Sequence, residues 1–277
     1  MPPMNSTDRY LDLLKGCLTR SLFLDEQRQE VHLAGWRWYL WKAFKRLEKG
    51  YNWRIVGPRP VVVANREEGR DWPQNGETMI GKARLDNLQA CVTQVLEDDV
   101  PGDLLEAGVW RGGASILMRA VLAVYGSDRA VWLADSFEGL PPPDTERFPQ
   151  DAGLDFSQFP ALKVGVEQVK ANFAKYGLLD DQVRFLPGWF KDTLPSAPIE
   201  QLALIRLDGD LYESTIDSIA ALYPKLSVGG FLIVDDYNNP GWAKAAGQAI
   251  RDYREEHGIT EPIQEIDWTG VYWRRER

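Results

Sequence analysis

Residues 202–236 read LALIRLDGDLYESTIDSIAALYPKLSVGGFLIVDD, which is the pattern of a strand, a helix and a second strand. The apolar runs 202–207 and 231–234 show no alternation, as is typical of strands that are buried on both faces of a parallel sheet. Residues 213–226 between them have the length and composition of a crossover helix. The segment therefore predicts two neighbouring parallel strands within an α/β fold.

An acidic cluster follows each of these two strands, Asp208-Gly209-Asp210 after the first and Asp235-Asp236 after the second. Neighbouring strands lie about 4.8 Å apart, so carboxylates at both strand ends can reach one hard cation. A single Asp-Gly-Asp would favour a turn, but two clusters at matched strand ends would repel one another without a cation. The pattern predicts a magnesium or manganese site at the edge of the sheet where the strands end.

The rest of the chain extends this architecture. Helices are expected at 8–24, 36–49 and 78–96, and a βα alternation follows with strands at 104–109, 130–136 and 182–186 and helices at 112–125 and 164–176. After a helix at 242–257, two short runs at 263–268 and 271–275 are separated by Thr269-Gly270 and predict an antiparallel hairpin. The prediction is an α/β class I methyltransferase (Rossmann-like) parallel sheet with a C-terminal antiparallel hairpin, in residues 101–277. Residues 1–100 are expected to form an N-terminal helical extension or cap.

Composition excludes several classes of function. The chain of 277 residues has two His and two Cys, so zinc sites, Ser-His-Asp catalysis and a disulfide framework are poorly supplied. The formal charge of −9 argues against a nucleic-acid partner. No apolar run or leader indicates a membrane span or secretion, so we expect a cytoplasmic location. The basic aromatic stretch 36–53 is predicted to pack on the body or on a second subunit, and we expect a homo-oligomer.

The turn after the strand at 104–109 indicates the cofactor. Its pattern is G-x-x-x-G-G with Glu106 two residues before the first glycine, Gly108, and not the dinucleotide pattern G-x-G-x-x-G. A carboxylate would repel a pyrophosphate but can accept a hydrogen bond from an amine, which favours S-adenosylmethionine. Asp135 ends the next strand, where an acid holds ribose hydroxyls. Gly188 and Trp189, after the third strand, are candidates to border the adenine.

Four motifs resemble the macrocin O-methyltransferase family. They are EAGVWRGGA (106–114), ADSFEGLP (134–141), TMIG (78–81) with RLDNL (84–88), and RLDGDLYEST (206–215). The resemblance runs from about Asp8 to Trp273 and is weakest between Glu26 and Asn65. Members of that family methylate sugar hydroxyls of macrolide and aminocoumarin antibiotics with S-adenosylmethionine and magnesium.

The resemblance implies roles for individual residues. Those implied to contact the cofactor are Thr78, Met79, Glu106, Gly108, Asp135 and Ser136, and those implied to hold Mg²⁺ are Asp208, Asp235 and Asp236. The related catechol methyltransferases place a Lys base three residues beyond the first metal Asp, where this chain has Leu211. We therefore expect a carboxylate base, Asp208 or Asp210, with Asp208 preferred.

Two other functions stay open on the sequence. A catechol or hydroxylated aromatic acceptor on the same scaffold would suit the 11 Trp residues. A noncatalytic module that binds a metal or a nucleotide would need no acceptor at all.

The segment 139–161 is a proline-rich insertion between the second strand and its helix. A loop longer than about 15 residues in a compact domain is usually functional or disordered. We predict that it is a mobile lid that orders over the acceptor. Phe148, Phe156 and Phe159 suit contact with a large, partly apolar acceptor, and packing on the body is the alternative for them.

Overall fold

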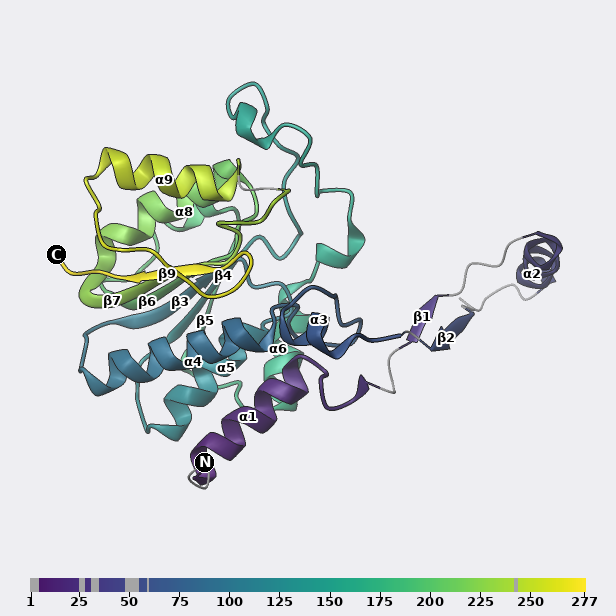
Figure 1. Cartoon of the computed structure of the whole chain (residues 1–277), viewed down its shortest axis with the longest axis horizontal. Coiled ribbons are helices and arrows are strands. Elements are labelled where there is room, and N and C mark those ends of the chain that lie inside the picture. Colours follow the sequence, from purple (N-terminus) through teal and green to yellow (C-terminus); the bar gives the residue numbers. More distant parts are fainter. Residues whose placement is uncertain (1–4, 25–27, 31–34, 48–54, 59, 242–243) are drawn as a thin grey trace.

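A seven-stranded sheet forms the centre of the computed structural model, which describes residues 5–24, 28–30, 35–47, 55–58, 60–241 and 244–277. The strand order is β5-β4-β3-β6-β7-β9-β8 (Figure 1). The strands are β3 (Asp103–Ala107), β4 (Val131–Asp135), β5 (Val183–Pro187), β6 (Leu202–Leu207), β7 (Leu226–Val234), β8 (Gln264–Glu265) and β9 (Val271–Arg274). Strands β3 to β7 run parallel, whereas β9 pairs antiparallel with both β7 and β8. The predicted sheet with its terminal hairpin is confirmed.

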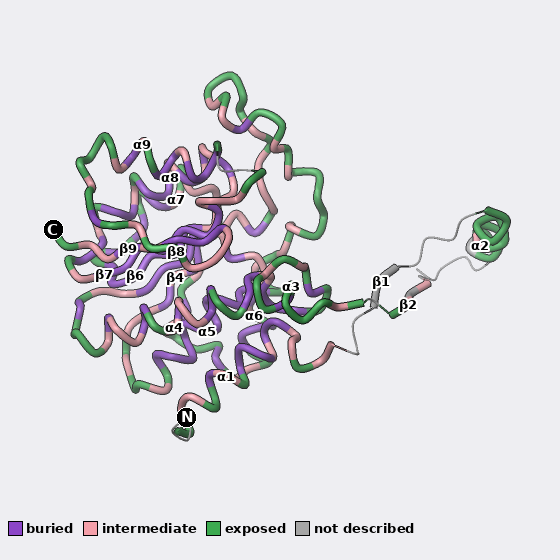
Figure 2. The backbone as a smooth tube through the Cα atoms, viewed as in Figure 1, coloured by how far each residue is buried: buried purple, intermediate pink, exposed green. Residues whose placement is uncertain are grey.

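Helices cover both faces of the sheet, which explains the continuous apolar strands. One face carries α1 (Ser6–Leu18), α4 (Lys82–Glu97), α5 (Gly113–Val124) and α6 (Val166–Lys175). The other carries α7 (Phe190–Thr193), α8 (Tyr212–Leu222) and α9 (Ala246–Glu256). Every residue of β6 is buried, and Figure 2 shows the buried residues concentrated in the sheet and on the inner sides of these helices.

The edges of some elements differ from the prediction. The helix expected from Thr78 begins only at Lys82, because the preceding chain runs extended against residues 67–69. A Cβ on Gly81 would lie 2.3 Å from the carbonyl oxygen of Glu67, so only glycine allows this approach. Between the second and third predicted helices the structure adds a short helix, α3 (Val63–Glu67). The predicted helix start at Trp242 lies outside the described residues.

The N-terminal third contains a projecting arm. The strands β1 (Arg28–Glu30) and β2 (Val56–Pro58) pair antiparallel, and α2 (Trp36–Leu47) lies beyond them, away from the sheet (Figure 1). The side chains of Trp36 and Tyr39 are each 69% exposed, so the predicted packing of this helix on the body is not observed. By contrast, α1 and α4 share the core with β3 and β4. The division at residue 100 stays a prediction.

Within the described part of the chain, no helix is both long and apolar enough to cross a bilayer.

Candidate active site

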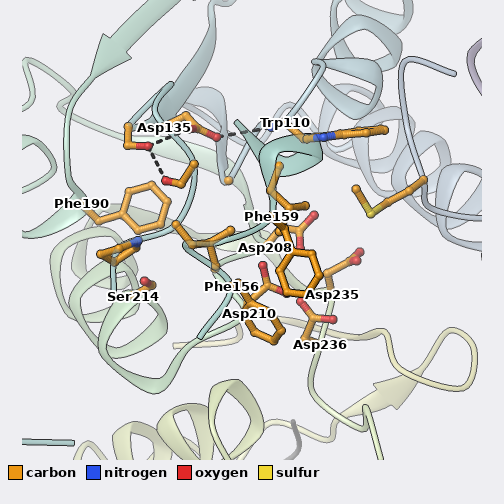
Figure 3. A pocket seen from close by; sticks show the side chains of 18 of the residues that line it. Trp110, Asp135, Phe156, Phe159, Phe190, Asp208, Asp210, Ser214, Asp235 and Asp236 are labelled. Atoms are coloured by element: carbon orange, nitrogen blue, oxygen red, sulfur yellow. Dashed lines mark hydrogen bonds between the residues drawn. The ribbon is translucent and has the colours of Figure 1, made fainter. Parts of the chain in front are cut away.

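A cavity of about 570 Å³ opens at the edge of the sheet where the parallel strands end (Figure 3). The chain passes from β3 outward to β4 and β5 and then returns to the other side of β3 with β6. Ligands of α/β proteins bind at such a change of direction. Nine of the residues predicted from the sequence line the cavity: Met79, Gly108, Asp135, Ser136, Trp189, Asp208, Asp210, Asp235 and Asp236.

The glycine turn after β3 packs directly on the acidic turn after β6. Gly108 has φ +91°, and a Cβ there would lie 1.9 Å from the carbonyl oxygen of Asp208. The backbone N–H of Asp208 donates to the carbonyl of Ala107 at 2.8 Å. The absence of a side chain at 108 therefore brings the two turns into one site.

Asp135 holds the glycine turn in place from the end of β4. Its Oδ2 accepts the backbone N–H of Val109 at 2.7 Å, and its Oδ1 accepts that of Phe137 at 2.7 Å. Burial raises the pKa of Asp135, although these backbone donors oppose the effect. Two longer contacts, from the backbone N–H of Trp110 to Oδ2 at 3.4 Å and from the hydroxyl of Ser136 to Oδ1 at 3.5 Å, take the other acceptor positions, so hydroxyl groups of a ligand in the cavity would compete with these two weaker donors (Figure 3).

Three predicted cofactor residues do not line the cavity. Glu106 is buried beneath it, where it accepts Arg206 Nη1 at 2.6 Å and the hydroxyl of Ser115. Burial raises the pKa of Glu106 to about 7. Thr78 is also buried, and its Oγ1 accepts the N–H of Ile80 at 3.3 Å. Gly188 donates its N–H to the carbonyl of Asp135 at 2.9 Å and positions the turn after β5. These residues support the cavity from outside. Each carboxylate oxygen of Glu106 accepts one hydrogen bond, from Arg206 or from Ser115, and the predicted contact of Glu106 with an amine stays a prediction.

The opposite side of the cavity holds a group of acids. Carboxylate oxygens of Asp208, Asp210 and Asp236 lie within 4.8 Å of one another. Oδ2 of Asp236 is buried and has no hydrogen-bond partner among the described residues. Burial and the neighbouring acids raise the pKa of Asp210 to about 8 and that of Asp236 well above its usual range. A buried group of acids with an unpaired oxygen fits a divalent cation that prefers oxygen ligands.

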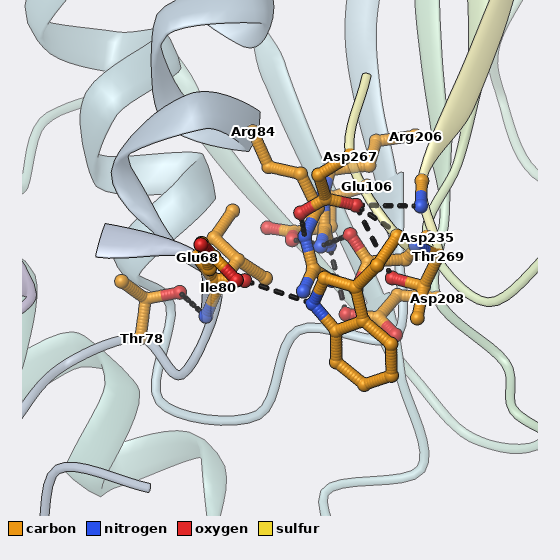
Figure 4. Close-up of polar contacts among 12 residues, drawn as sticks. Glu68, Thr78, Ile80, Arg84, Glu106, Arg206, Asp208, Asp235, Asp267 and Thr269 are labelled. Carbon is orange, nitrogen blue, oxygen red and sulfur yellow. Dashed lines mark hydrogen bonds and ion pairs between the residues drawn. The ribbon is translucent and has the colours of Figure 1, made fainter. Parts of the chain in front are cut away.

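Asp235 lies beside this group but faces two arginines (Figure 4). Arg206 Nη2 donates to its Oδ1 at 2.5 Å, and Arg84 Nη1 donates to its Oδ2. Burial alone would raise the pKa of Asp235, but the two guanidinium groups outweigh burial and hold the pKa below its usual value. Each oxygen of Asp235 keeps a lone pair, so the arginines orient this carboxylate without excluding it as a ligand.

Arg84 and Arg206 were not among the predicted site residues. Arg206 also donates to Asp208 Oδ2 at 2.9 Å, and Arg84 Nε donates to Asp267 Oδ2 at 2.8 Å (Figure 4). For Arg206 a signal existed, because an arginine inside an otherwise apolar buried strand requires an acidic partner. For Arg84 no such signal existed, because its partners Asp235 and Asp267 lie 151 and 183 residues away along the chain.

Comparison with known proteins identifies the enzyme. The model of the family described as macrocin O-methyltransferase (TylF) matches residues 7–275. The chain belongs to the macrocin O-methyltransferase family. It is therefore an S-adenosylmethionine-dependent O-methyltransferase, as the resemblance predicted, and the noncatalytic alternative is set aside.

Relatives of this methyltransferase act in the synthesis of natural products. The 8-demethyl-8-(2,3-dimethoxy-α-L-rhamnosyl)-tetracenomycin-C 4′-O-methyltransferase of Streptomyces olivaceus is 50% identical over 98% of this chain and 94% of that protein. The mycinamicin III 3″-O-methyltransferase of Micromonospora griseorubida is 45% identical over 99% of both chains. The solved structure of the O-methyltransferase NovP superimposes with a TM-score of 0.83 at 43% identity, over 98% of this chain and 100% of that one.

Aromatic side chains form much of the remaining cavity wall of this methyltransferase. Those that line it are Trp72, Trp110, Phe156, Phe159, Trp189, Phe190 and Trp268. Trp268 Nε1 donates to the carbonyl of Glu68 at 2.9 Å, which ties the connection of the terminal hairpin to the loop after α3. Of the three phenylalanines predicted to meet the acceptor, Phe156 and Phe159 line the cavity beside the acids, whereas Phe148 does not (Figure 3).

We expect Asp135→Ala to weaken binding of S-adenosylmethionine by about 1–3 kcal/mol, because backbone donors of the glycine turn lose their acceptor. Isothermal titration calorimetry measures the dissociation constant of S-adenosylmethionine. Asp135→Asn keeps one acceptor oxygen, so its dissociation constant should lie between those of the wild type and of Asp135→Ala. An unchanged dissociation constant for Asp135→Ala would remove Asp135 from the cofactor site.

Proposed function

We propose that this protein transfers a methyl group from S-adenosylmethionine to a hydroxyl of a sugar on a glycosylated natural product, with the assistance of Mg²⁺. The observation that carries the proposal is the acid group of Asp208, Asp210 and Asp236 in the same cavity as the glycine turn. A sugar hydroxyl is a poor nucleophile at neutral pH, so its methylation requires activation of the hydroxyl. A cation held by these acids would lower the pKa of the hydroxyl. The relatives named above act on a rhamnosyl-tetracenomycin and on mycinamicin III, which supports the acceptor class.

The residues that would hold Mg²⁺ are Asp208, Asp235 and Asp236. Asp208 and Asp236 have oxygens close together, and Asp236 offers its unpaired Oδ2. Asp235 is included because the resemblance predicts it as a ligand. Arg84 and Arg206 donate to its two oxygens, and each oxygen keeps a lone pair. When bound, the cation would lower the pKa of an acceptor hydroxyl and orient it.

Asp210 is the better candidate for the base, in place of the predicted preference for Asp208. Burial raises the pKa of Asp208, but Arg206, which donates a hydrogen bond to its Oδ2, opposes the rise and favours the charged form. No arginine of the described residues donates to Asp210, which sits at φ +58° at the end of the acidic turn and lines the cavity. We assign to Asp210 the removal of the hydroxyl proton as the oxygen attacks the methyl group in line with the departing sulfur.

Asp210→Asn should lower kcat by about 10²- to 10⁴-fold, the range expected for loss of a positioned general base. The affinity for S-adenosylmethionine should change little, because Asp135 stays in place, whereas the affinity for Mg²⁺ should fall because a neighbouring negative charge is lost. We therefore compare kcat at saturating Mg²⁺. Mass spectrometry of the methylated acceptor measures turnover, and calorimetry measures both affinities. A variant that retains wild-type kcat would return the role of base to Asp208.

A hydroxylated aromatic acceptor is the second candidate, and the tryptophans of the cavity wall favour it. A panel of glycosides, their aglycones and simple catechols, assayed with S-adenosylmethionine and Mg²⁺, separates the two. Turnover restricted to the glycosides supports a sugar acceptor, whereas turnover of aglycones and catechols would replace it.

Homo-oligomerisation, a cytoplasmic location and the lack of a nucleic-acid partner stay predictions from the sequence.

A further inference from the structure

The insertion 139–161 is fastened to the body through one fully buried acid. Asp151 closes the short 3₁₀ turn Pro149–Asp151 and is 0% exposed. Its Oδ1 accepts the backbone N–H of Tyr212 at 2.6 Å, and its Oδ2 accepts that of Glu213 at 3.2 Å. These are the first two residues of α8, 61 and 62 positions later in the chain.

Helix α8 has no cap of its own. The residue at its N-cap position is Leu211, whose side chain accepts no hydrogen bond. The first N–H groups of a helix lack partners within the helix, and a carboxylate there is favoured by both hydrogen bonding and the helix dipole. Asp151 therefore supplies from the insertion what the local sequence of α8 lacks. The ring of Phe148 adds a second contact, with its centroid 5.7 Å from that of Tyr212.

The capped residues directly follow the acidic turn. The first residue of the acidic turn 208–210 is held in place, because the N–H of Asp208 donates to the carbonyl of Ala107 in β3. At the other end, the left-handed Asp210 is followed by the buried Leu211 and then by the capped start of α8. A shift of the first turn of α8 would consequently move Asp210.

The same acid also precedes the apolar part of the cavity wall. Phe156 and Phe159 come five and eight residues after Asp151, and both line the cavity that contains the acids. Their rings lie 6.4 Å apart. One side chain thus connects the segment that presents these rings to the turn that presents Asp208 and Asp210.

We propose that Asp151 is a positioning residue for methyl transfer, which sets the distance between the acceptor wall and the proposed base by capping α8 from the insertion. The inference rests on the proposed function, since it assigns Asp210 and the two phenylalanines to the reaction. It also divides the insertion. Asp151 anchors it at one point, and Trp110 Nε1, which donates to the carbonyl of Ala161 at 2.8 Å, anchors its end, so any closure over the acceptor is confined to the part from Ala152 to Pro160.

The test compares Asp151→Ala, Asp151→Asn and a matched control, Asp103→Ala. Like Asp151, Asp103 accepts two N–H groups, those of Ala130 N and Trp132 Nε1, each at 2.8 Å. Asp103 is the first residue of β3, so it lies at the end of the strand opposite to the cavity. Asp151→Ala should lower kcat/KM for the acceptor about 10- to 100-fold, the effect of misplacing reacting groups, through both kcat and the acceptor KM. The dissociation constant for S-adenosylmethionine should stay the same. Asp151→Asn, which keeps one acceptor oxygen, should recover most of the loss, and Asp103→Ala should lower the Tm without changing kcat or KM.

Hydrogen–deuterium exchange supplies a readout that needs no acceptor. In Asp151→Ala, exchange should accelerate in residues 207–213 and in residues 152–162 together, and in neither segment for Asp103→Ala. Faster exchange in 207–213 alone, or a kcat and KM equal to those of Asp103→Ala, would show that Asp151 only stabilises α8 and overturn the proposal. If the wild-type protein methylates no glycoside, the proposed function fails, while the exchange result still decides whether Asp151 couples the two segments.

Discussion

Asp208→Asn is expected to reduce methyl transfer by about 10³-fold or more, because it removes both a proposed ligand and the negative charge that retains the cation. Treatment with EDTA should have the same effect on the wild-type protein, and added Mg²⁺ should restore activity. Binding of S-adenosylmethionine should persist in the variant. The side chain that holds the glycine turn is Asp135, which accepts the N–H of Val109 and is unchanged. Turnover by mass spectrometry and cofactor affinity by calorimetry report the two quantities separately.

Asp192→Asn is the matched control for that experiment. Asp192 is an exposed acid of α7 outside the cavity lining, and its substitution changes the net charge by the same amount. Its activity should equal that of the wild type. Full activity of the wild type in EDTA would falsify the metal-assisted mechanism, and the hydroxyl would then have to be activated by the protein alone.

Among the proposed variants, Arg206→Met should lose the most unfolding free energy. Arg206 is 2% exposed and donates to Glu106, Asp208 and Asp235. Its removal leaves the buried Glu106 without its ionic partner and takes one of two arginines from the buried Asp235. Loss of one partner of a buried ion pair costs about 3–5 kcal/mol of unfolding free energy. Urea denaturation measures the loss. Arg119→Met is the control: Arg119 pairs with Asp180, whose side chain is 42% exposed, so we expect a loss of about 1 kcal/mol or less.

The loss should depend on pH with a defined sign. Burial already raises the pKa of Glu106 to about 7 while Arg206 opposes the rise, so removing Arg206 raises the pKa further. An acid whose pKa is higher in the folded than in the unfolded state destabilises the fold increasingly as the pH rises above its unfolded pKa. Arg206→Met should therefore lose more stability relative to the wild type at pH 8 than at pH 5. An equal loss at both values would show that the three acids are not the cause.

The sequence was sufficient for the parts of the fold that repeat a local pattern. The unbroken apolar runs of β6 and β7 predicted buried parallel strands, and the acids that follow them lie at one edge of the sheet, as the sequence predicted. The terminal hairpin followed from the short spacing between two strand-like runs. These signals lie within a few residues of one another, so a reading along the chain detects them.

Features that depend on distant partners were not predictable in this way. The ion pair between Glu106 and Arg206 was not predicted: an arginine inside an apolar strand signals an acidic partner, but nothing near it in the sequence shows which acid that is. Asp151 lies in an insertion that was predicted to be a mobile lid, and its role depends on the start of α8 lacking a cap. The helix predicted from Thr78 was shortened by the contact of Gly81 with residues 67–69, which overrides local helix propensity.

The contact between Gly108 and Asp208 limits how enzymes of this kind can be recombined. The backbone of the cofactor turn touches the backbone of the acidic turn, so a small change in the path of either turn displaces the other. A chimaera that takes one of these turns from a relative and keeps the other must fit together two backbone segments that come from different proteins. Crossover points that inherit residues 104–113 and 202–213 from the same parent avoid this conflict. Acceptor preference is then better exchanged through the distal half of the insertion, from Ala152 to Pro160, with Asp151 retained as the fixed junction.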